Sequence, residues 1–276
     1  MTTQTVGIIG ATGKTGYRVS QQLNKMGVAV KELSRNTAPS FDWMDRSNWE
    51  HALQGVTALY VTYHPDLAVP QAKADIEHLL NVAKKLKVEH IVLLSGRGED
   101  GARAAEVLLE QSGIDWNVVR ASWFMQNFSE SFMLDGILAR NLVLPQPKAS
   151  EPFISVDDIA DVAVAALTQP QLRNQLFEVT GSEILSFDEC MEIISQEINE
   201  HVELTVVPLD AYIEAGKDAG MTDDMAWLMQ ELFSQVLDGR NEYTTNTVEA
   251  VLGKPARTFR EYVRAVAATS VWSPTS

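Results

Sequence analysis

The chain has 276 residues, of which 45% are hydrophobic and 21% charged, a composition typical of a globular protein with a sizeable core. No stretch approaches the roughly 18 consecutive apolar residues of a membrane helix, and the start, Met1–Thr5, lacks the basic and apolar regions of a signal peptide. We therefore expect a cytoplasmic protein with no membrane partner. Cys190 is the single cysteine, which excludes an intramolecular disulfide, and no Cys/His cluster has the spacing of a metal site.

The formal net charge of −15 argues against nucleic acid as a partner, because phosphates would be repelled. Residues 1–150 are neutral overall, so the whole negative excess lies in residues 151–276. Two interpretations stay open: the excess serves solubility, or it attracts a cationic substrate.

The first 120 residues alternate short β-branched runs with helical patterns, which is typical of a parallel α/β sheet. The predicted strands, in chain order, are 6–9, 28–33, 56–61, 90–94 and 116–120. The predicted helices between them run from a glycine-rich turn to about residue 26, over about 67–86, and over about 101–112.

After residue 140 the pattern becomes less regular and mostly helical. A helix is predicted over 159–167, after the helix-capping acids Asp157 and Asp158, and a strand over 177–179. Further helices are predicted over about 186–198, 208–219 and 222–238, with a last one that begins near Thr258. The sequence thus predicts one large α/β domain with a smaller, acidic, mostly helical portion woven onto it.

The most specific motif is a glycine-rich turn between the first strand and the first helix. Gly10, Gly13 and Gly16 are spaced G-x-x-G-x-x-G. In that context the glycines permit a tight turn, close approach to a pyrophosphate, and close packing of helix on strand. Gly13-Lys14-Thr15 also invites a phosphate-loop interpretation, but that motif requires glycine at position 8, which is Ile8. The turn therefore predicts dinucleotide binding.

The end of the second strand indicates which dinucleotide is bound. Ser34 and Arg35 fall where the adenosine ribose should lie, and a guanidinium suits a 2′-phosphate. Glu32, two residues before Ser34, is the rival signal, because an acidic residue at this strand end grips the free ribose of NAD. We predict that NADP(H) is preferred, with NAD(H) as the alternative.

Several further stretches carry a family resemblance that spans nearly the whole chain. With the glycine motif they make the chain resemble the NmrA-like group of atypical short-chain dehydrogenases; the stretches are Val92–Ser95, Leu108–Arg120 and Pro152–Ala160. Within that group the chain is similar to the festuclavine dehydrogenase-like branch of ergot-alkaloid biosynthesis and its bacterial relatives. That closer match rests on Phe41–Trp43, Ser122–Glu130 and Gly253–Arg260.

The resemblance implies a Rossmann-like parallel sheet with helices on both faces. Residues 1–150 would form the NAD(P)-binding domain, and residues 151–276 a small, mostly helical substrate-side portion. The loop after the first strand would hold the pyrophosphate through Gly10, Thr12, Gly13, Lys14, Thr15 and Gly16. Two strand ends would flank adenosine and nicotinamide, namely Thr62-Tyr63 and Ser95-Gly96, as expected for ligands beyond the carboxyl ends of parallel strands.

One departure from the short-chain dehydrogenase pattern concerns the proton donor. The usual Tyr-x-x-x-Lys positions, counted back from Ser112-Gly113, fall at Gly98 and Ala102, neither of which can donate a proton. The usual phenol acid is therefore absent. The candidates for a catalytic role are Tyr63, His64 and Asn127.

An aromatic run follows the strand that ends at Arg120. Its members Trp123, Phe124, Met125, Asn127 and Phe128 form a patch with one amide that suits a planar apolar substrate. The alternative is that Phe124 and Phe128, four residues apart, are core contacts of a helix. Arg120 itself fits a structural ion pair at a strand end better than a substrate clamp.

Together these features predict an NAD(P)H-dependent oxidoreductase that gives hydride to a small, planar or cyclic unsaturated electrophile such as an iminium, quinone or enone. The alternative is a non-catalytic redox sensor that binds NAD(P) and contacts a regulatory partner, since some NmrA-like proteins are regulators. The expected ligands are small molecules, and a homodimer is compatible with the sequence.

Overall fold

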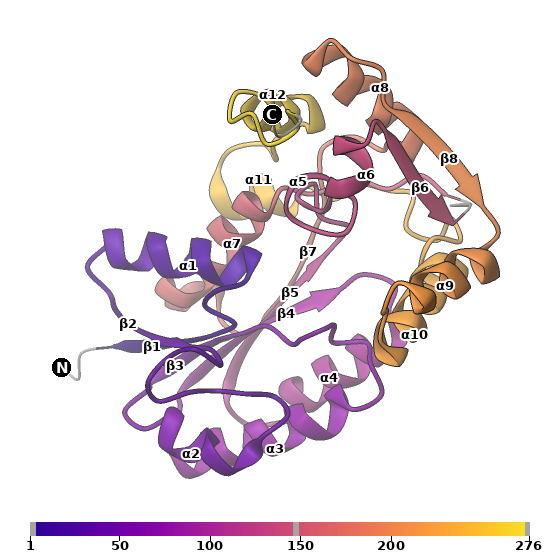
Figure 1. The fold of residues 1–276 in the computed structure, drawn as a ribbon. Coiled ribbons are helices and arrows are strands. Elements are labelled where there is room, and N and C mark those ends of the chain that lie inside the picture. The colour runs from indigo at the N-terminus through magenta and orange to yellow at the C-terminus, as the bar shows by residue number, and fades with distance from the viewer. Residues whose placement is uncertain (1–3, 146–148, 274–276) are drawn as a thin grey trace. The chain divides into compact units, whose positions relative to one another are not determined.

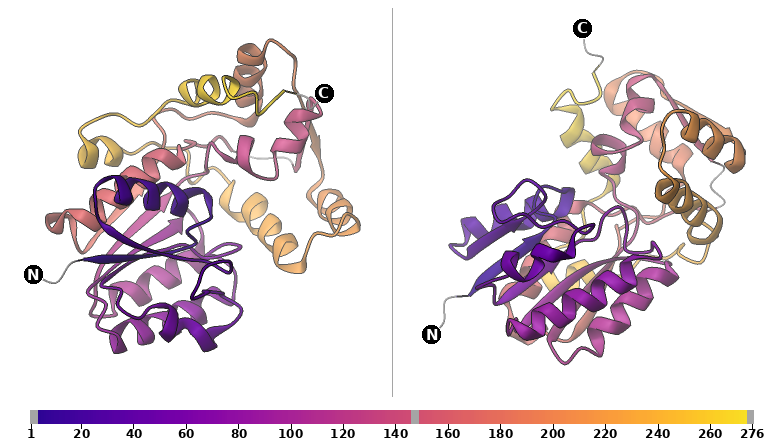
Figure 2. Two further views of the ribbon diagram at one scale, coloured as in Figure 1. Left: turned by 60° about the vertical axis from the view of Figure 1, so that its left-hand side comes forward. Right: turned by 60° about the horizontal axis from the view of Figure 1, so that its bottom comes forward.

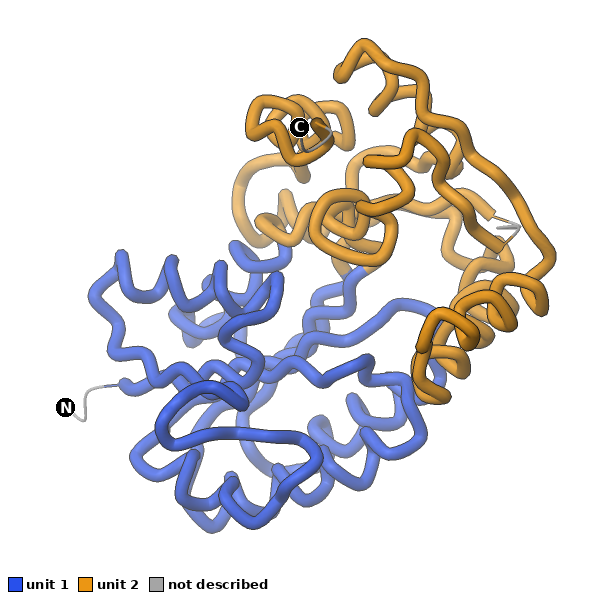
Figure 3. The backbone as a smooth tube through the Cα atoms, viewed as in Figure 1, with its two compact units in different colours: residues 1–121, 159–178 blue, residues 122–158, 179–276 orange. Residues whose placement is uncertain are grey.

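The computed structural model of the chain describes residues 4–145 and 149–273. The chain divides into two compact units, of which unit 1 comprises residues 1–121 and 159–178 and unit 2 comprises residues 122–158 and 179–276 (Figure 3). The chain therefore passes between the units three times.

Unit 1 is built around a sheet. Within its described residues six strands form one sheet in the order β2-β1-β3-β4-β5-β7 (Figure 1). Their bounds are β1 Thr5–Ile9, β2 Ala29–Leu33, β3 Ala58–Val61, β4 His90–Gly96, β5 Asp115–Ala121 and β7 Gln175–Val179. The pairings of β1 with β2 and β3, of β3 with β4, and of β4 with β5 are all parallel. Central strands such as β3 are buried along their whole length, which explains their continuous apolar runs.

Helices cover both faces of this sheet. The helices α1 (Lys14–Lys25) and α7 (Val156–Thr168) lie on one face, where Gln22 Nε2 donates to Asp161 Oδ1 over 2.8 Å (Figures 1 and 2). The other face is covered by α2 (Trp49–Ala52), α3 (Ala72–Lys85) and α4 (Asp100–Glu110). Short 3-10 turns occur at Arg46–Asn48 and Pro170–Leu172. This arrangement confirms the predicted Rossmann-like α/β fold.

The strand order of the unit 1 sheet changes direction at β1. β1 lies between β2 and β3, so the chain leaves β1 toward one side for β2 and then crosses to the other side for β3. In open parallel sheets, ligands bind beyond the carboxyl ends of the strands at such a switch point. The glycine-rich turn follows β1 at this place.

Unit 2 combines a small two-stranded sheet with helices. The strands β6 (Asn141–Pro145) and β8 (Glu203–Val207) pair in parallel. The helices are α5 Asn127–Glu130, α6 Leu134–Leu138, α8 Phe187–Ile198, α9 Leu209–Asp218, α10 Asp223–Glu231, α11 Thr247–Leu252 and α12 Phe259–Ala267. The core contains large buried rings, including Phe128, Phe153, Phe187, Phe259 and Trp272.

Most element boundaries match the sequence pattern, and the differences have local causes. The predicted helix over 67–86 begins only at Ala72, because residues 66–70 form turns. The predicted helix over 222–238 ends as α10 at Glu231 and continues as one π-type turn over Leu232–Val236. β6 and β8, each five residues long, were not predicted.

Two absences hold within the described residues. None of their helices is both long enough and apolar enough to cross a membrane. In the same part of the chain, no group of three or more His, Cys, Asp or Glu side chains is arranged to hold a metal ion.

A buried histidine lies at the amino-terminal end of β4. His90 has no exposed surface, and its Nε2 contacts Asn117 Oδ1 over 2.9 Å. The Asn117 amide nitrogen donates to the carbonyls of Leu172 and Gln175, so Oδ1 is the acceptor and His90 Nε2 carries the proton. Burial is the main cause that lowers the pKa of His90, so the folded protein holds the ring neutral.

We expect the free energy of unfolding to fall as the pH drops below about 6.5, the ordinary histidine pKa, by up to about 1.4 kcal/mol per pH unit. In this pH range His90 is protonated in the unfolded chain but stays neutral in the folded chain. The effect ends where the pH reaches the lowered pKa of folded His90. Urea denaturation at several pH values measures this slope. His90→Gln keeps a donor toward Asn117 but cannot titrate, so an unchanged slope in this variant would contradict the assignment.

Candidate cofactor site

The turn after β1 is closed by backbone hydrogen bonds. Gly10 N donates to Leu33 O over 3.0 Å, which ties the turn to the end of β2, and Gly13 N donates to Gly10 O over 2.9 Å. Gly10 has φ +82°, a left-handed conformation that glycine adopts without steric cost. The turn is therefore preformed by the backbone, and α1 begins directly after it.

Two of the three glycines are required by close contacts. A Cβ at Gly10 would overlap Thr62 Oγ1 at the end of β3, and a Cβ at Gly16 would overlap the Gly10 carbonyl. The side chain of Thr62 is fixed here, because its hydroxyl donates to Ile9 O over 3.1 Å. These contacts bring the turn, the start of α1 and the end of β3 together.

The start of α1 fits an anionic group. Gly13 is the N-cap residue and provides no side-chain hydrogen bond to the helix, so the first-turn amides of this 12-residue helix are left to an external acceptor. Thr12 and Gly13 are exposed, and Lys14 is partly exposed. Thr15 is 3% exposed, so its side chain is buried behind the turn. The predicted loop thus suits the pyrophosphate of a dinucleotide.

The end of β2 carries the two residues that bear on the choice of cofactor. Glu32 favours NAD, and Arg35 favours NADP. Glu32 accepts a hydrogen bond from Ser20 Oγ on α1 over 2.5 Å, which engages its carboxylate within unit 1. Ser34 is buried, and its hydroxyl accepts from Asn36 N over 3.2 Å. Arg35 is exposed, and no partner for its guanidinium is found among the described residues. Glu32 is exposed as well, so both charged groups at this strand end are open to a ligand, and Arg35 is the one without a partner among the described residues.

The segment after β3 is held by an aromatic and ionic cluster. Trp43 Nε1 donates to Thr62 O over 3.1 Å, and its ring lies 4.6 Å from that of Tyr63. The Tyr63 hydroxyl donates to Asp75 Oδ2 over 2.6 Å, and Arg46 pairs with the same buried carboxylate. The Tyr63 hydroxyl is therefore engaged by a structural carboxylate. His64, the next residue, is exposed.

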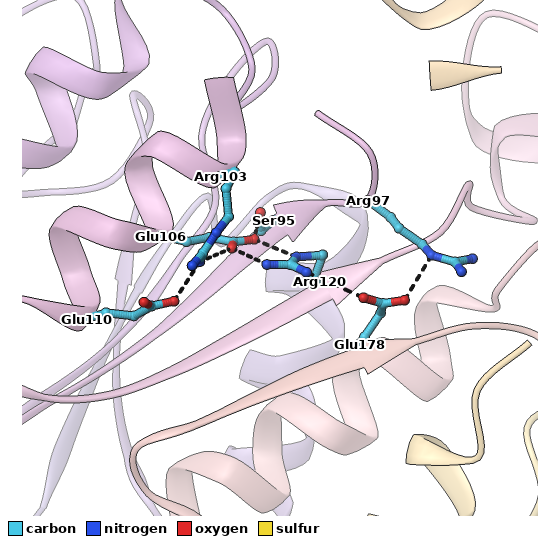
Figure 4. Close-up of polar contacts among 7 residues, drawn as sticks. All are labelled: Ser95, Arg97, Arg103, Glu106, Glu110, Arg120 and Glu178. Carbon is cyan, nitrogen blue, oxygen red and sulfur yellow. Dashed lines mark hydrogen bonds and ion pairs between the residues drawn. The ribbon is translucent and has the colours of Figure 1, made fainter. Parts of the chain in front are cut away.

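A buried charge network crosses the carboxyl ends of β4, β5 and β7 (Figure 4). Glu106 on α4 has no exposed surface and accepts from Ser95 Oγ over 2.6 Å. Arg120 donates to both of its carboxylate oxygens, over 2.9 and 2.5 Å, and Arg103 donates over 2.9 Å. Burial acts to raise the pKa of Glu106, but the hydrogen bonds from Arg120, Ser95 and Arg103 outweigh it, so the pKa is lowered.

The network continues to β7, the strand at the edge of the sheet, through alternating arginine and glutamate side chains. Arg120 Nη1 lies 3.3 Å from Glu178 on β7, and Arg97 Nε lies 3.1 Å from the other oxygen of Glu178. Arg120 is thus part of a structural ion-pair network, as the sequence favoured. The Ser95 hydroxyl is engaged by this network, since it donates to Glu106, and the residue is 3% exposed.

Two acidic residues that were not predicted as site residues lie at the same edge of the sheet. Asp66 follows β3 and Glu99 precedes α4, and burial raises the pKa of Asp66 despite a smaller opposing effect of the Glu99 side chain. Single acids in loops after strands carry no recognisable spacing. The signal available in the sequence was the proximity of Glu99 to Gly98, the position where the usual tyrosine is replaced.

The aromatic run lies in unit 2 and packs mostly into its core. Met125 and Phe128 have no exposed surface, and Trp123 is 9% exposed. The Phe128 ring lies 5.4 Å from Phe153 in an edge-to-face contact. Within the run, Phe124 and Asn127 are partly exposed. The core interpretation therefore fits the buried members, and the prediction of substrate contact remains for Phe124 and Asn127.

Comparisons with known proteins agree with this geometry. Residues 10–170, more than half of the chain, match the family described as NAD(P)H-binding. The chain is 30% identical to an agroclavine dehydrogenase of Claviceps fusiformis, covering 94% of this chain and 96% of that protein. It is 27% identical to an NAD(P)H azoreductase of Xenophilus azovorans, covering 95% and 97%.

A solved structure shows the same fold over nearly the whole chain. The NADPH-dependent quinone oxidoreductase QOR2 of Escherichia coli, complexed with NADPH, superposes with a TM-score of 0.79 at 20% identity, covering 95% of this chain and 99% of that one. The chain belongs to the NAD(P)H-binding family, and with its dehydrogenase and reductase relatives it is an NAD(P)H-dependent oxidoreductase.

Proposed function

We propose that this protein is an NADP-preferring reductase that transfers hydride to a small, planar or cyclic unsaturated electrophile, such as an iminium, quinone or enone. The observation that carries the proposal is the preformed glycine turn, with exposed Arg35 at the neighbouring strand end. The relatives' names support a conjugated acceptor, because one is an azoreductase and the structural neighbour is a quinone oxidoreductase.

The chain's own residues account for binding and orientation in this proposal. The first-turn amides of α1 bind the pyrophosphate, and Arg35 binds the 2′-phosphate of the ribose. Thr62 and the aromatic cluster behind it hold the end of β3 against the glycine turn. When bound, the nicotinamide supplies the hydride.

The proposed class of electrophile rests on the two positions at the start of α4 where related enzymes carry a tyrosine and a lysine. Gly98 has φ +80° and no side chain, and Ala102 is fully buried in α4. Neither position offers the phenol and ammonium that assist the reduction of simple ketones. An electrophile that is already activated, by positive charge or by conjugation, needs less assistance.

Arg35→Ala is expected to weaken NADPH binding about tenfold to a hundredfold, because a charge-assisted hydrogen bond contributes about 1.5–3 kcal/mol. NADH binding should change less than about twofold, since NADH has no 2′-phosphate. Isothermal titration calorimetry measures both affinities. Lys25→Ala, which removes an exposed cation at the other end of α1, is the control for net charge. An equal loss for both cofactors would refute the role assigned to Arg35.

The proposed reaction is tested by a screen of acceptors with NADPH. Quinones, enones and cyclic iminium ions should be reduced, and simple ketones should be reduced negligibly. Efficient reduction of simple ketones would overturn the proposed substrate class. Tight NADPH binding without reduction of any acceptor would instead favour the redox sensor.

A further inference from the structure

The strand β2 carries two opposite charges near its carboxyl end. Glu32 is the fourth of the five residues of β2, and Arg35 lies two residues after the strand ends. Both residues are exposed. A carboxylate at this strand end can accept a hydrogen bond from the free 2′-hydroxyl of NAD, whereas a guanidinium can bind the 2′-phosphate of NADP. The chain therefore carries the determinants of both cofactors three positions apart, and the contacts of each side chain decide which one acts.

The carboxylate of Glu32 is held by a serine on the neighbouring helix. Ser20 Oγ on α1 donates to Glu32 Oε1 over 2.5 Å, the short distance of a hydroxyl that donates to an ionised carboxylate. Ser20 has no exposed surface, so its hydroxyl cannot exchange this partner for bulk water. The hydrogen bond therefore joins β2 to α1 and keeps the carboxylate beside the helix.

The same part of β2 is in contact with the glycine turn. Glu32 lies in register with Ile8 of β1. The carbonyl of the next residue, Leu33, accepts hydrogen bonds from Gly10 N over 3.0 Å and from Ala11 N over 3.4 Å. Glu32 thus directly precedes the residue that ties β2 to the turn, at the end of the strand where an acid meets the adenosine ribose in NAD-binding sheets.

Arg35 lies in a turn that is closed by hydrogen bonds. Thr37 Oγ1 accepts from Ser34 N over 2.9 Å, and Phe41 N donates to Ser34 O over 2.9 Å. Among residues 4–145 and 149–273 the Arg35 guanidinium has no partner. The two charges are therefore unequal before any cofactor binds, because the carboxylate is engaged and the guanidinium is not.

We propose that Ser20 is a positioning residue that sets the cofactor preference by holding the Glu32 carboxylate away from the adenosine ribose. This inference rests on the proposed function, in which Arg35 binds the 2′-phosphate. The held carboxylate neither accepts from the 2′-hydroxyl of NADH nor repels the 2′-phosphate of NADPH. Without the serine hydroxyl the carboxylate is free to do both, and it can also compete with the phosphate for Arg35. Each of these changes favours NADH over NADPH.

Ser20→Ala is expected to lower the ratio of NADPH affinity to NADH affinity about tenfold, as expected for the loss of one hydrogen bond to a charged group. Isothermal titration calorimetry measures both dissociation constants. Ser20→Ala combined with Glu32→Gln should restore the wild-type ratio to within about threefold, because the glutamine amide carries no charge. The control is Ser112→Ala, which removes another buried serine hydroxyl, located after α4, and should leave the ratio unchanged.

The results of this experiment separate the role of Ser20 from the proposed function. An unchanged ratio in Ser20→Ala, or a lowered ratio that Glu32→Gln does not reverse, would overturn the role of Ser20 whatever the preference of the wild type. If the wild type binds NADH as tightly as NADPH, the proposed preference fails. The role of Ser20 still stands in that case when Ser20→Ala strengthens NADH binding and Glu32→Gln removes the gain.

Discussion

Glu106→Ala is expected to lower the free energy of unfolding by about 3–5 kcal/mol, because it leaves the buried part of an ion-pair network without its anion. Glu106 has no exposed surface and accepts hydrogen bonds from Ser95, Arg103 and Arg120. Without it, Arg120 faces Arg103 across the space that the carboxylate filled. Urea denaturation followed by circular dichroism measures the change.

The control for this prediction lies in the same network. Glu110 pairs with Arg103 over 2.6 Å, but its side chain is 26% exposed and Arg103 is 48% exposed. Glu110→Ala should therefore cost less than about 1 kcal/mol, as expected for a pair in contact with solvent. Similar losses in the two variants would contradict the view that Glu106 is the centre of the network.

Gly10→Ala is expected to weaken NADPH binding by about a hundredfold or more, equivalent to about 2.7 kcal/mol or more. The new methyl group would overlap Thr62 Oγ1, so the turn must move away from β3 and the first-turn amides of α1 move with it. Calorimetric titration with NADPH measures the loss.

Gly27→Ala is the matched control for the backbone cost. Gly27 has φ +74°, similar to Gly10 at +82°, but nothing lies within 4 Å of a Cβ built there. Both variants carry the left-handed penalty of about 1–2 kcal/mol, and only Gly10→Ala distorts the turn. Unchanged NADPH affinity in Gly10→Ala would show that the turn is not the binding site.

The sheet and its glycine turn were predictable because local signals agree there. Buried parallel strands give continuous apolar runs, and Gly10, Gly13 and Gly16 mark a strand-turn-helix junction at fixed spacing. The strands β6 and β8 were not predictable in this way, since each is a five-residue strand with exposed positions in a small sheet.

The electrostatic parts of the candidate site could not be predicted, because they depend on contacts between distant segments. The charge network joins Glu106 to Arg120 and Glu178. Glu178 lies in the segment 159–178, which belongs to unit 1 but follows a segment of unit 2 in the chain. The aromatic run left two interpretations open, since an apolar pattern does not distinguish a pocket wall from a core.

The most direct test of the account uses NADPH that carries deuterium at the transferred position of nicotinamide C4, with a cyclic iminium as the acceptor. Mass spectrometry of the amine product measures whether the label has moved to carbon. The account predicts one deuterium per amine, with Arg35→Ala slowing the reaction at low NADPH concentration and saturating NADPH restoring the wild-type rate. Amine without deuterium, or no amine despite bound NADPH, would contradict hydride transfer by this protein.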